Sequence, residues 1–122
     1  MSYIYAENID LVQPLPEIPP FTSLFSVGYN KRNLQIIIEN EYQAMQIRVS
    51  DLVGEKESEA FTVFNITASY LFFKRLNLGL GLDNIFNKNY YRHLSRPYKN
   101  MDSNSMFYES GRSFSIFIKC KF

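Results

Sequence analysis

Strict two-residue alternation at the end of the chain is the feature that most limits how it can fold. The apolar residues Phe114, Ile116, Ile118, Cys120 and Phe122 alternate with Ser113, Ser115, Phe117, Lys119 and Lys121. Successive side chains of a β-strand point to opposite faces, so this segment is predicted to be a strand with one apolar face and one mostly small or basic face. Such a strand must separate lipid or an apolar core from water.

Four further segments show the same period and pair into two predicted hairpins. Residues 76–83 and 64–72 alternate in this way, and the short link Phe73-Lys74-Arg75 favours a tight reversal between them. A second hairpin is predicted from Thr22 to Asn30 and from Asn33 to about Gln46, with turn-type residues at the link. The segment Tyr3 to Ala6 is expected to be the remnant of one earlier strand. An amphipathic helix is the competing reading for residues 33–46 and 61–73, but their β-branched and aromatic residues disfavour it.

Long polar segments alternate with the short links. Residues 50–59 and 87–110 are expected to be loops, and residues 13–20 are not expected to pair in a ladder because their prolines lack the donor N–H. Short turns on one side and long loops on the other are typical of outer-membrane barrels. The predicted fold class is therefore all-β: an antiparallel up-and-down meander of about six strands, forming an arc of a large transmembrane β-barrel.

Composition excludes several function classes. The net charge of +1, from 13 basic and 12 acidic residues, gives no extended field for nucleic acid. One cysteine, Cys120, and one histidine, His93, provide neither a disulfide nor a Cys/His metal cluster. No apolar run is long enough for a transmembrane helix, and the first residues do not resemble an export signal. We expect no cofactor, no metal site and no enzyme.

Three motifs in order resemble the C-terminal barrel region of TonB-dependent outer-membrane receptors. They are Pro14-Leu-Pro-Glu-Ile-Pro-Pro20 with Gln46-Ile-Arg-Val-Ser-Asp51, then Leu80-Gly-Leu-Asp-Asn-Ile-Phe-Asn-Lys-Asn-Tyr90, then Gly111-Arg112-Ser113 and the strand to Phe122. The likeness covers almost the whole chain. It departs from the family's pattern at Ser110, where the family has proline, and at Cys120, where the family has an aromatic residue.

This resemblance implies a place in the outer membrane of a Gram-negative bacterium. It implies import of a scarce nutrient, such as an iron chelate (siderophore) or cobalamin, through a barrel of about 22 strands closed by a plug. Residues 1–122 would then be a single unit, the C-terminal fragment of the barrel domain, with the plug and earlier strands absent. The implied partners are outer-membrane lipid, the remaining strands and plug, a TonB-type energising complex that contacts the missing part, and the barrel-assembly machinery. The fragment alone is not expected to transport.

The candidate site residues fall into three groups. An aromatic and basic cluster in the longest loop is a possible substrate-contact surface: Arg92, His93, Arg96 and Tyr98. For His93 the sequence specifies no partner nearby. Tyr90 and Tyr91 are expected in the interfacial aromatic girdle. The lipid-facing closing strand and assembly signal are expected at Phe114, Ile116, Ile118 and Phe122.

A small soluble β-barrel that binds an apolar ligand, in the manner of lipocalins, is the alternative. The two readings differ in which face of the sheet meets water. A soluble barrel encloses its apolar face, whereas a membrane barrel turns that face outward to lipid. The alternation alone is compatible with both readings, and the family motifs favour the receptor.

Overall fold

The computed structural model describes residues 1–9, 13–50, 54–95 and 107–120, and the chain divides into two compact units. The first, here called the loop unit, comprises Met1–Ser23, Tyr42–Phe61 and Asn89–Glu109. The second, the sheet unit, comprises Leu24–Glu41, Thr62–Lys88 and Ser110–Phe122. Each unit therefore assembles three segments that are far apart in the sequence.

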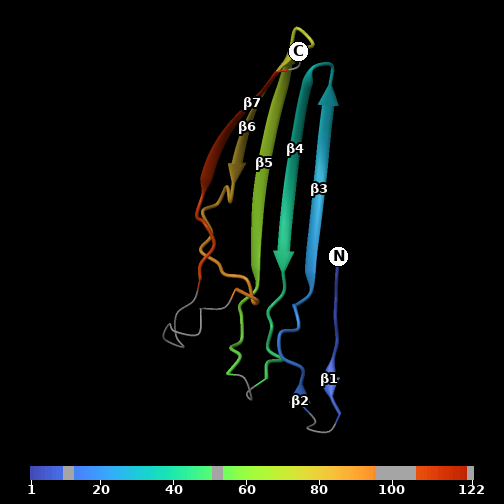
Figure 1. Cartoon of the computed structure of the whole chain (residues 1–122), viewed down its shortest axis with the longest axis vertical. Coiled ribbons are helices and arrows are strands. Elements are labelled where there is room, and N and C mark those ends of the chain that lie inside the picture. The colour runs from blue at the N-terminus through green and yellow to red at the C-terminus, as the bar shows by residue number, and fades with distance from the viewer. Residues whose placement is uncertain (10–12, 51–53, 96–106, 121–122) are drawn as a thin grey trace. The chain divides into compact units, whose positions relative to one another are not determined.

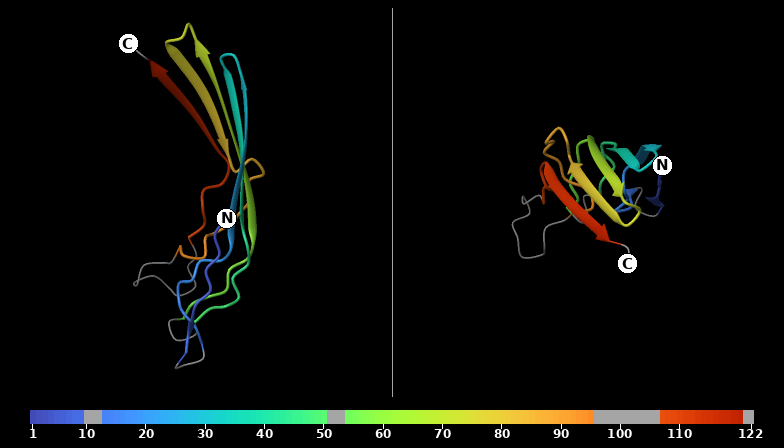
Figure 2. Two further views of the ribbon diagram at one scale, coloured as in Figure 1. Left: turned by 90° about the vertical axis from the view of Figure 1, so that its right-hand side faces the viewer. Right: turned by 90° about the horizontal axis from the view of Figure 1, so that it is seen from above.

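Five antiparallel strands form one sheet, in the order β3-β4-β5-β6-β7 (Figure 1). They are β3 (Thr22–Lys31), β4 (Leu34–Gln43), β5 (Phe61–Phe72), β6 (Leu76–Asp83) and β7 (Ser113–Cys120). Sequence neighbours are spatial neighbours throughout, and Figure 2 shows the strands rotated progressively against one another, as expected for a twisted sheet. The predicted all-β meander is confirmed.

The prediction of a sixth strand at Tyr3 to Ala6 is wrong, because these residues form no strand. Just before this segment, the Ser2 N–H donates to the Thr22 carbonyl at 2.9 Å and the Ser2 carbonyl accepts from the Thr22 N–H at 3.1 Å. At the other end of the segment, the Ala6 carbonyl accepts from the Leu15 N–H at 3.4 Å. In an antiparallel ladder the next hydrogen-bonded pair would join Ile4 to Pro20, and proline has no N–H to give. The ladder therefore stops after one bridge.

The expectation that residues 13–20 stay out of any ladder is also corrected. Strand β2 (Gln13–Pro14) pairs antiparallel with β1 (Glu7–Asn8), with Pro14 opposite Glu7. The pairing is only two residues long and has proline at one end, where the missing donor costs the ladder least.

The register of β6 and β7 brings the apolar residues of both strands to one face. Leu82, Leu80 and Leu78 stand opposite Phe114, Ile116 and Ile118. On the other face the ring of Phe117 lies over Gly79, where no side chain could be added without displacing it. This pairing of an aromatic residue with a glycine explains why β6 keeps a glycine inside a strand.

Both short links contain non-glycine residues with positive φ. Arg32, between β3 and β4, has φ 53°, and Phe73 and Lys74, between β5 and β6, have φ 47° and 59°. The Arg75 N–H donates to the Phe72 carbonyl at 3.0 Å, which closes the second turn. Two successive positive φ values match the twist of the flanking strands but are unfavourable for a bulky side chain such as phenylalanine.

Asn84 and Asn87 hydrogen-bond within the loop that follows β6 and to the residues before β7. Asn84 has φ 49° and is 3% exposed. Its side-chain NH2 group donates to the carbonyls of Lys88 at 2.8 Å and Ser110 at 3.3 Å. Its Oδ1 accepts from the Lys88 N–H at 2.8 Å. Asn87 Oδ1 accepts from the Arg112 N–H at 2.9 Å. These bonds fasten the loop after β6 to the residues that lead into β7.

Candidate ligand-contacting loops and the apolar strand face

His93, a predicted contact residue, is buried in the loop unit between two partners that lie far away in the sequence. Its Nδ1 is 3.1 Å from Ser58 Oγ and its Nε2 is 3.1 Å from Glu55 Oε1. Neither partner is close to His93 in the sequence, which agrees with the lack of a partner specified nearby. No local sequence pattern indicates these contacts, because both partners are more than thirty residues away.

Glu55 is the centre of this cluster, and its side chain is only 3% exposed. Its Oε1 accepts from the Glu17 N–H and its Oε2 from the Ser50 N–H, both at 2.9 Å. Desolvation by burial raises the pKa of the Glu55 carboxyl, but these two hydrogen bonds and the neighbouring His93 outweigh it. The net pKa therefore lies below the ordinary value of 4.5. An ionised Glu55 can only accept, so the hydrogen on His93 Nε2 points to it.

The order Ser58, His93, Glu55 places a hydroxyl, an imidazole and a carboxylate in a row. The same residue types serve nucleophilic catalysis where the hydroxyl faces a substrate. Here Ser58 is 2% exposed, so its hydroxyl is occupied as a buried hydrogen-bond partner. The cluster instead links Glu17, Ser50, Glu55, Ser58 and His93 to one another.

Arg92 lies next to His93 but has its own partners. Its Nε is 3.4 Å from Glu109 Oε1, and its guanidinium lies 5.9 Å from the centroid of the Phe61 ring. The other two residues of the predicted contact surface, Arg96 and Tyr98, lie outside the described residues. Its two described members are therefore engaged within the loop unit.

Tyr90 and Tyr91 pack on aromatic neighbours of the loop unit. The Tyr90 and Phe61 ring centroids are 4.3 Å apart, and those of Tyr91 and Tyr108 are 5.7 Å apart at 86°. The Tyr91 hydroxyl also donates to the Glu57 carbonyl at 3.3 Å. Both residues are half-buried, with apolar ring faces and polar tips, which is the chemistry of an interfacial tyrosine.

Strand β7 presents an apolar stripe on one of its two faces. Phe114, Ile116 and Ile118 are 65%, 65% and 66% exposed, and they continue the apolar face of β6. Cys120 follows them on the same face and is a free thiol. Phe122, the predicted end of this stripe, lies outside the described residues.

The described residues contain neither a metal-binding cluster nor a membrane-spanning helix. Within residues 1–9, 13–50, 54–95 and 107–120, no three His, Cys, Asp or Glu side chains gather so that they could hold a metal ion. In the same part of the chain, no helix is long and apolar enough to cross a membrane.

Comparison with known proteins places the fold. No protein-family model matches the chain, and no curated protein sequence matches it. Among solved structures, the chain is similar to a protein described as the copper transporter OprC, with a TM-score of 0.84 and 26% sequence identity. The match covers 97% of this chain and 19% of that transporter, so the chain spans a small part of its length. The described residues therefore have the fold of a segment of a TonB-dependent outer-membrane receptor barrel.

Proposed function

We propose that this chain supplies one arc, the C-terminal one, of a TonB-dependent transport barrel in the outer membrane of a Gram-negative bacterium. The observation that carries the proposal is the exposed apolar stripe along β6 and β7, on a sheet that matches a transport barrel.

Lipid is the environment that suits the outer face. Fully burying a leucine, isoleucine or phenylalanine side chain contributes about 1.5–3 kcal/mol, and Phe114, Ile116 and Ile118 forgo most of this in water. A contiguous apolar surface of this kind on a soluble protein marks an interaction site. Hydrocarbon chains satisfy such a stripe along its whole length. The opposite face carries Phe117 over Gly79 but is otherwise small or basic, with Ser113, Ser115 and Lys119, and suits a wet interior.

The edges of the sheet suit further strands. β3 and β7 are the outer strands of the five-stranded sheet, and outer strands present backbone N–H and C=O groups that hydrocarbon cannot satisfy. We propose that the remaining strands of a larger barrel pair with them, and that a plug fills the interior. The TonB-type energising complex would act through a part of the protein other than these residues. The assembly machinery would recognise β7 together with Phe122.

The loops would meet the ligand, and Tyr90 and Tyr91 would lie at the membrane interface. The transported ligand is a scarce nutrient: an iron chelate and cobalamin are the chemical classes that the sequence resemblance implies. The structurally similar protein is described as a copper transporter, so copper is a third candidate ligand to test. Uptake assays with cells that lack the corresponding gene, fed each nutrient in turn, separate the three.

Labelling of single cysteines tests which face meets lipid. With Cys120 replaced by serine, cysteines are placed at Ile116 on the apolar face and at Ser115 and Lys119 on the other face. The variants are reconstituted in phospholipid vesicles and labelled with a membrane-impermeant maleimide before and after solubilisation in denaturant. We expect the residue-116 cysteine to be protected in vesicles and the other two to react.

Protection of the residue-116 cysteine without any lipid would contradict the proposal. If the residue-116 cysteine is protected in detergent-free buffer and the protein remains monomeric and soluble, the apolar face is enclosed. A small soluble barrel that binds an apolar ligand is then the correct reading.

A further inference from the structure

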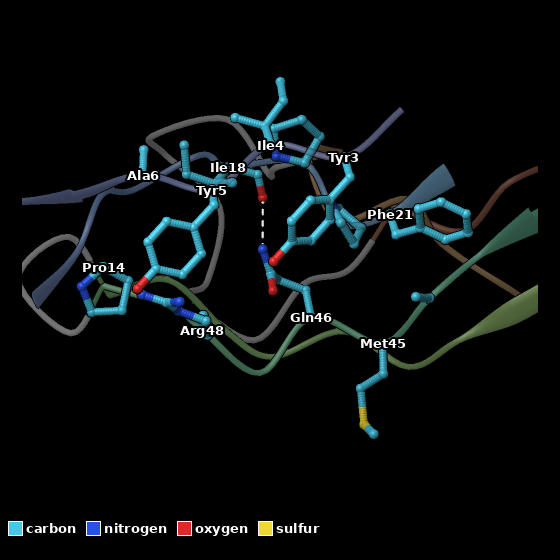
Figure 3. A pocket seen from close by; sticks show the side chains of 13 residues that line it. Tyr3, Ile4, Tyr5, Ala6, Pro14, Ile18, Phe21, Met45, Gln46 and Arg48 are labelled. Atoms are coloured by element: carbon cyan, nitrogen blue, oxygen red, sulfur yellow. Dashed lines mark hydrogen bonds between the residues drawn. The ribbon is translucent and has the colours of Figure 1, made fainter. Parts of the chain in front are cut away.

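A small cavity in the loop unit lies between the N-terminal segment and residues 44–48. Its volume is about 140 Å³, and Figure 3 shows the side chains around it. The walls are largely apolar and include Ile18, Pro20 and Phe21. A cavity of this size accommodates one benzene-sized ring.

Hydrogen-bond donors face this cavity from both segments. Tyr3 and Tyr5 project from the N-terminal segment toward Gln46 and Arg48 in Figure 3, and all four line the cavity. The Gln46 amide already has a hydrogen-bond partner within the chain, because its Nε2 donates to the Ile18 carbonyl at 2.8 Å. Among the described residues that line the cavity, Arg48 is the one charged side chain, and its guanidinium lies 4.0 Å from the centroid of the Tyr5 ring.

A carboxylate of the chain itself already lies beside this guanidinium. Glu7 Oε2 is 3.8 Å from Arg48 Nη2, which is longer than a hydrogen bond, and it accepts instead from the Tyr5 hydroxyl at 3.0 Å. Both charged side chains are more than one third exposed, so this ion pair is weak. The planar guanidinium can therefore exchange Glu7 for a carboxylate that makes two parallel hydrogen bonds.

We propose that this cavity is a binding site for a monocyclic aromatic carboxylate, with the ring against Ile18 and the carboxylate on Arg48. The volume selects a single ring, the apolar walls favour an aromatic group, and the lone charged lining residue selects an anion. The inference goes beyond the proposed transport role, since it concerns equilibrium binding to the loop unit and needs neither a plug nor an energising complex.

Ligand-observed NMR with benzoate tests the proposal on the whole 122-residue chain in detergent micelles. Saturation transfer from protein to benzoate is titrated, and the same titration is repeated with benzyl alcohol, which keeps the ring and removes the charge. We expect saturable binding of benzoate in the millimolar range and binding of benzyl alcohol at least about tenfold weaker, since the pair with Arg48 is charge-assisted. This comparison needs no variant, so it holds even if a variant fails to fold.

Three variants locate the site. Arg48→Gln should weaken benzoate binding about tenfold and leave benzyl alcohol unchanged. Ala6→Phe, which fills the cavity from its rim, should weaken both ligands. Arg75→Gln, in the turn between β5 and β6, removes the same charge from the sheet unit and should change neither, with far-UV circular dichroism confirming the fold of each variant.

Two results would overturn the inference. One is equal affinity of the unmodified chain for benzoate and benzyl alcohol, which would mean that Arg48 does not recognise the anion. The other is an absence of benzoate binding, or benzoate binding that is unaltered in both Arg48→Gln and Ala6→Phe. Unaltered binding would mean that the signal comes from benzoate in the micelle. Neither result bears on the cysteine-labelling test of membrane orientation.

Discussion

Replacing Asn84 with alanine removes the side chain that fastens the loop after β6 to the start of β7. Three hydrogen bonds are lost: two donated to the carbonyls of Lys88 and Ser110, and one accepted from the Lys88 N–H. The residue is almost fully buried, so water replaces these partners poorly. Alanine must also adopt the positive φ of 49° that asparagine tolerates.

The expected loss follows from these contacts. Each net hydrogen bond contributes about 0.5–1.5 kcal/mol, so three contribute about 1.5–4.5 kcal/mol. The left-handed conformation costs alanine about 1 kcal/mol more. Asn84→Ala should therefore lower the free energy of unfolding by about 3–5 kcal/mol, which is a large share of the 5–15 kcal/mol typical of folded proteins.

Urea unfolding of the chain in micelles, followed by circular dichroism, measures this loss. Asn84→Gly loses the same hydrogen bonds without the φ penalty, so its loss should be about 1 kcal/mol smaller. Asn87→Ala is the matched control, because Asn87 also has a positive φ but accepts the single bond from Arg112; about 2 kcal/mol is expected. A loss below about 1 kcal/mol for Asn84→Ala would refute the reasoning, because it is smaller than the hydrogen bonds alone allow.

Three further predictions concern single features of the structure. Gly79→Val should destabilise the sheet because the valine side chain meets the ring of Phe117. Adding Phe117→Ala should recover part of the lost free energy of unfolding. If the two losses measured by urea unfolding simply add, the contact is not the cause. Replacing Phe73-Lys74 with Asn-Gly should raise the free energy of unfolding by about 1 kcal/mol, because both residues have positive φ; an unchanged urea midpoint would speak against strain in this turn. Because Glu55 has a lowered pKa in the folded chain, its stabilisation is complete above the ordinary carboxyl pKa of 4.5 and is lost as pH falls through the folded value. Glu55→Gln should flatten this acid dependence of stability, and identical pH profiles would disprove the role of its carboxylate.

Alternation in the sequence was sufficient for most of the sheet. Strands with one apolar face have a period of two that no helix shares, so the hairpins around Arg32 and Lys74 and the closing strand could be predicted without coordinates. Turn residues limited the links to a few positions, and short links force sequential strands to be neighbours. The meander therefore followed from local chemistry.

The tertiary structure alone decided which polar residues meet. Nothing local to His93 indicates Glu55 or Ser58, because the contact depends on where two distant loops return. The loss of the expected strand at Tyr3 was equally invisible, since it depends on the register that would set Ile4 opposite Pro20. Side-chain periodicity is a property of each segment, whereas partners and register depend on how separate segments are brought together, and the sequence of one segment does not contain that information.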